Sequence, residues 1–256
     1  MPELPEVESV VRVLAPRITG RRLQRIDVAS RKPWARMIGP AEGKQVRRVR
    51  RYGKYILFDL DEGLLAVHLG MTGKLLVNAD PGPHARAVLV FDGVNVVYDD
   101  VRQFGSMRWL PHEPEGLGPD ALEVAAADFA RMLLARKGRI KALLLNQAFL
   151  RGLGNIYSDE ALFRAGIHPL AEAGRLSRRR ILRLHSAIKQ VLEQAIAKGG
   201  SSISDYLDPD GRRGWFQIEH RVYGRAGEPC KRCGARIRRI LVAQRSTHFC
   251  PQCQRK

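Results

Sequence analysis

The sequence predicts an α+β protein built from several parts, and three observations carry this prediction. Short apolar runs separated by turn residues fill the chain from about residue 22 to 110, which is typical of a β-sandwich or barrel. The second half changes to the helical period of about 3.6 residues. The C-terminal region holds two Cys-x-x-Cys pairs, which predict a small metal-binding unit.

The composition indicates a polyanionic partner. Forty-four Lys and Arg against 26 Asp and Glu give a formal net charge of +18, and an excess of that size favours nucleic acid. The charge is clustered, since residues 225–256 hold nine Lys or Arg and one Glu. The sequence has no membrane-length apolar run, signal peptide, lipidation motif or basic amphipathic helix, so we expect a cytoplasmic chain without membrane contact.

The chain begins with residues suited to nucleophilic chemistry. Met1 precedes a small residue of the kind from which an initiator methionine is trimmed, so Pro2 is expected to carry a free secondary amine with Glu3 beside it. A terminal amine has a pKa of about 7.7 to 8, so about a tenth of it is unprotonated at neutral pH. A secondary amine that attacks a carbonyl-type carbon gives a charged iminium, which is a good electron sink.

The following residues predict a helix that holds this terminus against a core. Pro5 lies in its first turn, and the helix is expected to end at Pro16. On this pattern alone, an ordinary amphipathic helix after a proline is the alternative. The apolar face consists of Val7, Val10, Val11 and Leu14.

Strands and a linker follow this helix. Hairpin-like turns at residues 61–63 and 92–93 separate apolar runs. Residues 111–120 contain three prolines and two glycines and are expected to form an interdomain linker. The clearest strands are residues 55–60, 64–69, 87–91 and 94–98.

The second half predicts helices over about residues 127–147, 155–165 and 177–198. The last of these has Ser177 as its N-cap and Gly199 as its stop. The glycine-rich residues 150–154 precede Asn155, a candidate N-cap, and exposed amides at such a helix start suit a phosphate oxygen. A tight structural turn is the alternative.

The cysteines predict a zinc site. Two Cys-x-x-Cys pairs separated by sixteen residues use every cysteine and suit tetrahedral zinc. Disulfides are the alternative, which a cytoplasmic location disfavours. Residues 235–242 and 246–249 predict a hairpin with Arg245 in its tip, suited to phosphate contact, although a solvated charge is the alternative. The expected ligands are Cys230, Cys233, Cys250 and Cys253.

Six motifs together resemble the formamidopyrimidine-DNA glycosylase family of bacterial base-excision repair enzymes, in family order over the whole chain. They are the PELPEVE start, Gly53-Lys54-Tyr55, the HLGMTG turn, the RQFG loop, the GLGNIYSDEAL turn and the zinc hairpin. The resemblance implies an N-terminal β-sandwich with the first helix (1–112), a linker (113–121), a helix-two-turns-helix domain with a lesion-capping loop (122–221) and a zinc finger (222–256). DNA would lie between the two lobes.

The resemblance implies a bifunctional DNA glycosylase and abasic-site lyase that removes oxidised purines, namely 8-oxoguanine and formamidopyrimidines. Pro2 would attack the damaged nucleotide and form a Schiff base, with Glu3 as acid and base. Lys54 is then linked to β-elimination, and Arg245 to δ-elimination and phosphate binding. The protein would act as a monomer on double-stranded damaged DNA, with one structural zinc ion and no organic cofactor.

The resemblance also implies contacts with DNA. A lesion-capping segment would comprise residues 199–202 and 208–214, whose polar, glycine-containing composition predicts mobility without DNA. Gln103 and Ala148 depart from residues that are often basic in relatives. The implied DNA-contacting residues are His84, Arg102, Lys137 and Asn155. The implied void-filling residues are Met71, Arg102 and Phe104; without the resemblance, Met71 and Phe104 would be expected in the core.

Two other functions stay open. An endonuclease VIII-like preference for oxidised pyrimidines keeps the enzyme class and changes the substrate, although the PELPE start favours purines. A non-catalytic zinc-ribbon protein that binds damaged DNA belongs to another class. Such a protein has no need of Pro2, Glu3 and Lys54, which are all present.

Overall fold

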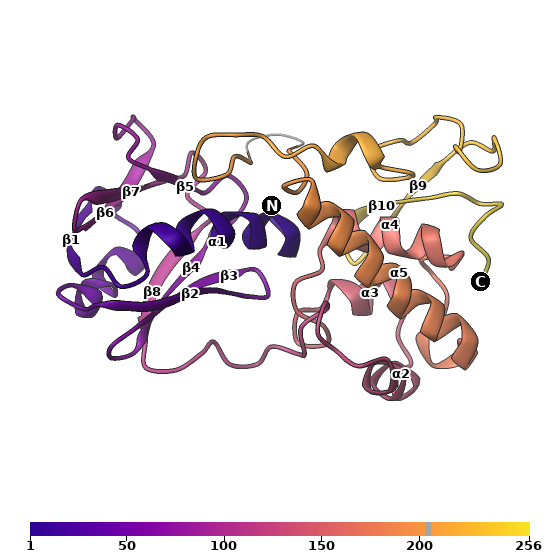
Figure 1. Cartoon of the computed structure of the whole chain (residues 1–256). Helices are drawn as coiled ribbons and strands as arrows, with labels where there is room; N and C mark the ends of the chain where they lie inside the picture. The colour runs from indigo at the N-terminus through magenta and orange to yellow at the C-terminus, as the bar shows by residue number, and fades with distance from the viewer. Residues whose placement is uncertain (203–205) are drawn as a thin grey trace. The chain divides into compact units, whose positions relative to one another are not determined.

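The computed structural model describes residues 1–202 and 206–256, which form two compact units (Figure 1). The first unit consists of Met1–Glu115 with Ile196–Gln217, and the second of Gly116–Ala195 with Ile218–Lys256. Among the described residues, every helix is too short or too polar to span a membrane. The division into four parts expected from the sequence stays a prediction.

The first unit is a β-sandwich with a helix at its start. In the described residues, two four-stranded antiparallel sheets have the strand orders β1-β6-β7-β5 and β2-β3-β4-β8. The strands predicted from the sequence are confirmed to within a few residues. The elements are α1 (Leu4–Ile18), β1 (Leu23–Val28), β2 (Val46–Tyr52), β3 (Tyr55–Leu60), β4 (Leu64–His68), β5 (Lys74–Val77), β6 (Ala85–Phe91), β7 (Val94–Asp99) and β8 (Ser106–Leu110), with short 3-10 helices at Pro33–Arg36 and Gly39–Ala41.

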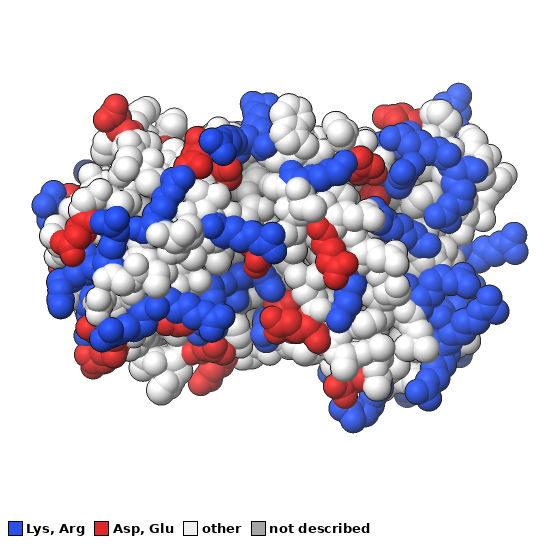
Figure 2. All heavy atoms as spheres, viewed as in Figure 1, with Lys and Arg blue, Asp and Glu red and all other residues white. Residues whose placement is uncertain are grey.

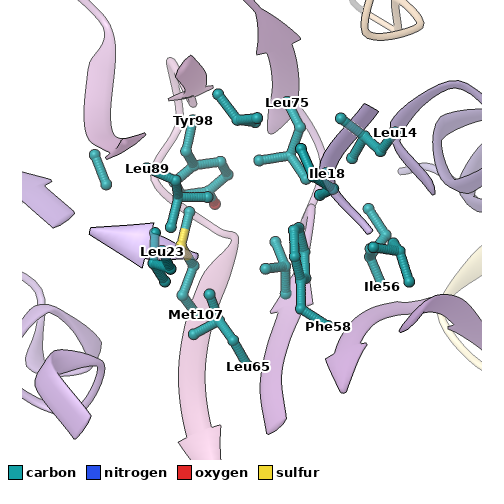
Figure 3. Close-up of a cluster of buried hydrophobic side chains, with 14 of the residues drawn as sticks. Leu14, Ile18, Leu23, Ile56, Phe58, Leu65, Leu75, Leu89, Tyr98 and Met107 are labelled. Atoms are coloured by element: carbon teal, nitrogen blue, oxygen red, sulfur yellow. The ribbon is translucent and has the colours of Figure 1, made fainter. Parts of the chain in front are cut away.

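One hydrophobic core joins both sheets to α1. Alternate residues of the strands point inward, as in β6, where Leu89 and Phe91 are buried and Val90 between them is not. Figure 3 shows Leu14 and Ile18 of α1 meeting side chains from the two sheets. The helix therefore packs as predicted, with Val7, Val10, Val11 and Leu14 buried.

The predicted end of the first helix at Pro16 is wrong. α1 continues to Ile18 with Pro16 inside its last turn. Proline removes one N–H donor, but the N–H of Thr19 still bonds to the carbonyl of Ala15 at 3.1 Å. Ile18 is fully buried in the core, so packing holds the last turn in place.

The second unit contains helices and a C-terminal hairpin. Its helix α5 is capped at Ser177, whose hydroxyl accepts the N–H of Arg180 at 3.4 Å, and Gly199 follows its end at φ 71°, both as predicted. The elements are α2 (Ala126–Leu134), α3 (Ile140–Leu145), α4 (Asn155–Ala165), α5 (Arg178–Ala197), β9 (Arg238–Val242) and β10 (Arg245–Phe249), with short 3-10 helices at Ala173–Arg175 and Phe216–Glu219.

The prediction of one helix over residues 127–147 is wrong, because the chain leaves the helix between α2 and α3. The carbonyl of Gly138 accepts the N–H of Ala173, and the N–H of Ile140 bonds to the carbonyl of Ala171. These long-range backbone bonds replace the helical ones, and Gly138 gives the chain the freedom to make them.

Candidate functional site

The N-terminal residues are ordered and buried. Pro2 is buried and Glu3 is 3% exposed, directly before α1 begins at Leu4. The N–H of Glu3 donates to Oε2 of Glu6 at 2.8 Å, which has the spacing of a capping box. The structure therefore holds the proposed nucleophile and its neighbouring carboxylate in one place instead of leaving the terminus frayed.

Glu6 also connects this terminus to a distant segment of the same unit. Its Oε1 accepts the N–H of Ser201 at 2.7 Å, and its backbone carbonyl accepts the hydroxyl of Tyr206 at 3.2 Å. Gly200 lies so close that a Cβ there would meet Oε1 of Glu6 at 2.7 Å. Sequence reasoning missed Glu6, although its spacing from Glu3 was a visible signal.

Lys54 occupies a tight turn between β2 and β3. Tyr52 and Tyr55 pair across the strands, and Gly53 takes φ 62° in the two-residue connection, so glycine is needed there. Lys54 is 7% exposed. The turn therefore fixes the backbone of this lysine and keeps its side chain out of bulk water.

The pKa of His68 is lowered by burial and by two positive charges near it, those of Lys54 and the amino terminus. Burial, then the positive charge of Lys54 and that of the amino terminus, lower the pKa of His68 to about 4. Its imidazole is therefore neutral at neutral pH, and its Nδ1 accepts the N–H of Gly70 at 3.1 Å. The structure thus brings Lys54 and the chain terminus within electrostatic reach of one histidine, which sequence reasoning did not single out.

Asp100 joins the HLGMTG turn to the RQFG loop. One carboxylate oxygen accepts the hydroxyl of Thr72 at 2.5 Å, and the other accepts the N–H of Gly105 at 2.9 Å. Thr72 in turn accepts the N–H of Arg102 at 3.0 Å. Asp100 is 1% exposed, so a single buried carboxylate sets the relative position of both loops. Its importance was not evident from the sequence.

The three predicted void-filling residues project from these joined loops. Met71 is 38% and Phe104 58% exposed, so the expectation that they belong to the core is wrong. The guanidinium carbon of Arg102 lies 4.6 Å from the centre of the Phe104 ring. Gln103 between Arg102 and Phe104 takes φ 54°, a left-handed backbone conformation that few non-glycine residues adopt. The structure therefore brings this trio together at the surface.

The segment expected to cap the lesion is tied to the first unit on both sides. Asp210 pairs with Arg17 of α1, and the carbonyl of Pro209 accepts the N–H of Val77 at 2.9 Å. The hydroxyl of Ser202 accepts the N–H of Gly214 at 2.9 Å. Residues 203–205, between the two parts of this segment, lie outside the described residues. Its mobility without DNA stays a prediction.

Asn155 and the glycine-rich turn belong to the second unit. The N-cap of α4 is Gly154 and Asn155 is its first helical residue, so the predicted N-cap is wrong. The Asn155 side chain is 7% exposed and donates from Nδ2 to the carbonyl of Ser246 at 2.8 Å. Gln147 holds the turn, because its side chain bonds to the N–H of Gly152 and the carbonyl of Leu153.

The C-terminal hairpin places Arg245 differently from the prediction. The two turn residues are Ala243 and Gln244, with φ of 48° and 60°, whereas Arg245 is the first residue of β10 and pairs with Val242. Positive φ at both turn positions is the signature of a tight hairpin turn. Arg245 is exposed beside the tip, so its side chain is still presented outward.

A buried ion pair connects this hairpin to the helices. Nζ of Lys141 in α3 lies 2.6 Å from Oδ1 of Asp159 in α4, and both side chains are fully buried. The other carboxylate oxygen of Asp159 accepts the N–H of His248 in β10 at 2.8 Å. Asp159 therefore fixes the hairpin relative to α4, and with it the positions of Asn155 and Arg245.

The remaining predicted contact residues lie on loops. His84 and Lys137 are exposed, before β6 and between α2 and α3 respectively. Ala148 is exposed beside the glycine-rich turn and its N–H bonds to Oδ1 of Asn146. Their exposure suits a contact role, but each role stays a prediction.

The four cysteines lie together and suit one zinc ion. All are free thiols within the described residues, and their Sγ atoms lie within 4.8 Å of one another. Tetrahedral zinc with Zn–S bonds of about 2.3 Å requires Sγ–Sγ distances of about 3.8 Å, and two of the pairs measure 4.0 Å (Cys230 and Cys253) and 3.4 Å (Cys233 and Cys250). Burial and the neighbouring thiols raise the pKa of Cys253 to about 12, so four thiolates here need a cation.

The whole chain is similar to known proteins. The family model "Formamidopyrimidine-DNA glycosylase N-terminal domain" matches residues 1–107, "Formamidopyrimidine-DNA glycosylase H2TH domain" matches 116–206, and "Zinc finger found in FPG and IleRS" matches 227–255. Curated proteins named formamidopyrimidine-DNA glycosylase, from Solibacter usitatus and Variovorax paradoxus, are 50% and 43% identical, with all of each chain covered.

Solved structures show the same likeness. The crystal structure of the MutM (Fpg) protein from Thermus thermophilus is 42% identical, with a TM-score of 0.90 over 99% of this chain and 98% of that chain. A complex between the Lactococcus lactis Fpg and DNA containing an abasic site is 37% identical, with a TM-score of 0.89 over 99% of this chain and 100% of that chain. The three matched models and the full-length identities show that the chain belongs to the formamidopyrimidine-DNA glycosylase family.

Proposed function

We propose that this chain is a DNA glycosylase and abasic-site lyase that removes oxidised purines from double-stranded DNA in the cytoplasm of a bacterial cell, acting as a monomer. The observation that carries the proposal is the buried, ordered N-terminus, where Pro2 and Glu3 share one region with Lys54. A protein that only binds DNA has no use for a chain terminus fixed in this way.

The amine of Pro2 attacks C1′ of the damaged nucleotide once Met1 has been removed. The bond to the base breaks first, and the sugar ring then opens at the C1′–O4′ bond as O4′ takes a proton. The iminium that results acidifies the neighbouring sugar protons. Glu3 supplies and removes protons at the sugar and the leaving base. Lys54 assists β-elimination, and Arg245 assists δ-elimination while it holds the phosphate.

DNA binding is assigned to side chains and backbone groups on both units. His84 and Lys137 contact phosphates, and Asn155 with the N–H groups at the start of α4 forms a further phosphate site. Arg102 contacts the DNA. Together with Met71 and Phe104, it inserts into the DNA duplex and fills the space that the extruded base leaves. Cys230, Cys233, Cys250 and Cys253 hold the zinc ion that stiffens the hairpin carrying Arg245.

The preference for oxidised purines is supported by relatives. Solved complexes of the Lactococcus lactis Fpg, 37% identical to this chain, contain DNA with Fapy-dG, a ring-opened purine. An endonuclease VIII-like preference for oxidised pyrimidines is the alternative, and the experiment must distinguish it from a preference for oxidised purines. The departures at Gln103 and Ala148 lie where they can alter the grip on phosphate or the lesion.

The experiment is borohydride trapping on duplexes that carry either 8-oxoguanine or an oxidised pyrimidine. We expect a covalent adduct that favours 8-oxoguanine and is weakened in both Pro2→Gly and Glu3→Gln. Mass spectrometry of the same samples verifies that Met1 has been removed. An adduct that favours the pyrimidine would change the substrate class. No adduct on either duplex, despite tight binding and a free Pro2, would support the non-catalytic function.

A further inference from the structure

A strongly basic concavity lies in the second unit, and none of the residues assigned to catalysis lines it. Its cationic lining consists of arginines and one lysine, and no Asp or Glu is among the described residues that line it. It is formed by the end of α4, the first turns of α5, the first cysteine knuckle and the C-terminal segment. The charged residues are Arg164, Arg180, Arg183, Arg232, Arg255 and Lys256.

The concavity is held in shape by specific contacts. The C-terminal segment is fixed to the end of α4, because the N–H of Arg255 bonds to the carbonyl of Gly166 and its carbonyl accepts the N–H of His168. Arg180 donates to that same carbonyl of Arg255 at 2.6 Å. The guanidinium of Arg232 lies 4.5 Å from the centre of the Phe163 ring. Four segments are therefore joined around one group of positive charges.

Several of these cations have no acidic partner in the described part of the fold. Within the described residues, Arg180, Arg183 and Arg255 form no ion pair with an acidic side chain. Arg178, Arg179 and Arg180 open α5, at the positive end of the helix dipole, where cations are unfavourable. Figure 2 shows Lys and Arg gathered on the second unit where α5 begins and the chain ends. Positive charge left without acidic partners in one concavity suits an anionic ligand.

From this cluster we propose that the concavity binds the phosphodiester backbone of a second segment of nucleic acid. Planar guanidinium groups suit phosphate oxygens, and several in one concavity can neutralise several phosphates together. An acidic protein is less suited, because the lining between the charges is Ala165, Gly166 and Cys253 and offers no large apolar anchor.

The proposed surface is separate from the phosphate site of the catalytic function. That site lies at Asn155, the first residue of α4, whereas the concavity begins at Arg164, in the last turn of α4. Nine steps of helix separate the two by about 14 Å. Both ends of α4 can therefore hold a phosphate group at once, and the protein would bridge two DNA segments.

A bridging experiment tests the proposal. A lesion-free duplex is fixed to beads and saturated with the zinc-loaded full-length protein, and a second, fluorescent duplex is added. We expect wild type to capture the second duplex, and Arg183→Glu and Arg255→Glu each to lower capture about fivefold or more. Retention of protein on the first duplex and borohydride trapping on a lesion duplex should change less than about twofold, which separates this surface from the catalytic function.

Arg178→Glu is the matched control, since Arg178 is exposed on the same helix and does not line the concavity. It should capture the second duplex as wild type does, and melting curves verify that all variants fold. No capture by wild type, or equal loss in Arg178→Glu, would overturn the proposal. Polyglutamate and unlabelled duplex are then compared as competitors at equal total charge. If polyglutamate displaces the captured duplex as well as the unlabelled duplex does, the surface would be assigned to an acidic protein instead.

Discussion

The carboxylate of Glu6 accepts the N–H of Ser201 at 2.7 Å, which fastens the first turn of α1 to a segment that follows α5 in the chain. The same carboxylate accepts the N–H of Glu3 at 2.8 Å. One buried side chain therefore positions the proposed catalytic terminus and the base of the proposed capping segment together. Its geometry can be tested without touching Pro2 or Glu3.

Glu6→Gln should impair the reaction more than binding. Glutamine keeps the shape but replaces one acceptor oxygen with an N–H₂ group, so one of the two backbone N–H groups loses its partner at a cost of about 1–3 kcal/mol. We expect borohydride trapping to fall about tenfold or more, with duplex affinity nearly unchanged. Glu8→Gln is the control, because Glu8 lies on the same helix and pairs with Arg12 and Arg51 instead. Equal effects of both substitutions would contradict a positioning role for Glu6.

Gly200→Ala should destabilise the protein through a clash with Glu6. The added Cβ would lie 2.7 Å from Oε1 of Glu6, in a residue with φ 82°. Gly211→Ala is the control, since Gly211 has φ 77° and open space around it, so it reports the backbone strain alone. We expect Gly200→Ala to lower the free energy of unfolding by about 2 kcal/mol more than Gly211→Ala, measured in urea. If both substitutions lower the free energy of unfolding equally, the segment around Gly200 moves away from Glu6 at no cost.

Acid should weaken the fold before the carboxylates titrate. The pKa of His68 is lowered to about 4 by burial and by the neighbouring positive charges, against about 6.5 in the unfolded chain. Between these values the unfolded state binds the proton and the native state does not, so stability falls as pH decreases from about 6.5 to 4, by about 3 kcal/mol for this group.

The measurement is the melting temperature of wild type, His68→Gln and His112→Gln across this range. Buried His220, whose pKa is also lowered to about 4, contributes a second loss of the same sign. We therefore expect His68→Gln to flatten the pH dependence by about half. His112 is exposed, and its replacement should leave the profile unchanged. A His68→Gln profile as steep as that of wild type would mean that His68 accepts a proton in the native state.

Cys233→Ser should abolish zinc binding and reduce DNA affinity about tenfold or more. Loss of one thiolate leaves three ligands and removes the constraint on the hairpin that carries Arg245. Zinc content is measured by a colorimetric chelator and affinity by fluorescence anisotropy. Wild type stripped of zinc should regain affinity when zinc is restored, whereas the variant should not. Unchanged affinity in the zinc-free variant would exclude the hairpin from the DNA-binding surface.

Local sequence patterns predicted most of the fold. Alternating apolar residues set the strands, and Ser177 with Gly199 marked the ends of α5, because these signals act within a few residues. The errors have long-range causes. The chain leaves the helix between α2 and α3 because Gly138 and Ile140 bond to the backbone of Ala173 and Ala171. α1 passes Pro16 because Ile18 is buried among strands distant in the chain.

The candidate site was predictable where a motif is contiguous. Pro2, Glu3 and the four cysteines stand in short, distinctive patterns. Glu6, Asp100 and Asp159 were missed because each acts by bonding to backbone groups far along the chain, and a lone carboxylate carries no sign of such a partner in the sequence. Glu6 alone offered a clue, through its capping-box spacing.

The stacking of Arg102 on Phe104 has a consequence for the free protein in solution. Phe104 is 58% exposed, so its ring offers an apolar surface through which two copies of the protein can associate. A hydrated charge over its face makes such contact costly, since the guanidinium would have to be desolvated or displaced. Replacing Arg102 with alanine is therefore expected to promote association of free molecules through Phe104 as well as to remove the proposed contact with DNA. A loss of activity in that variant would then have two separate sources.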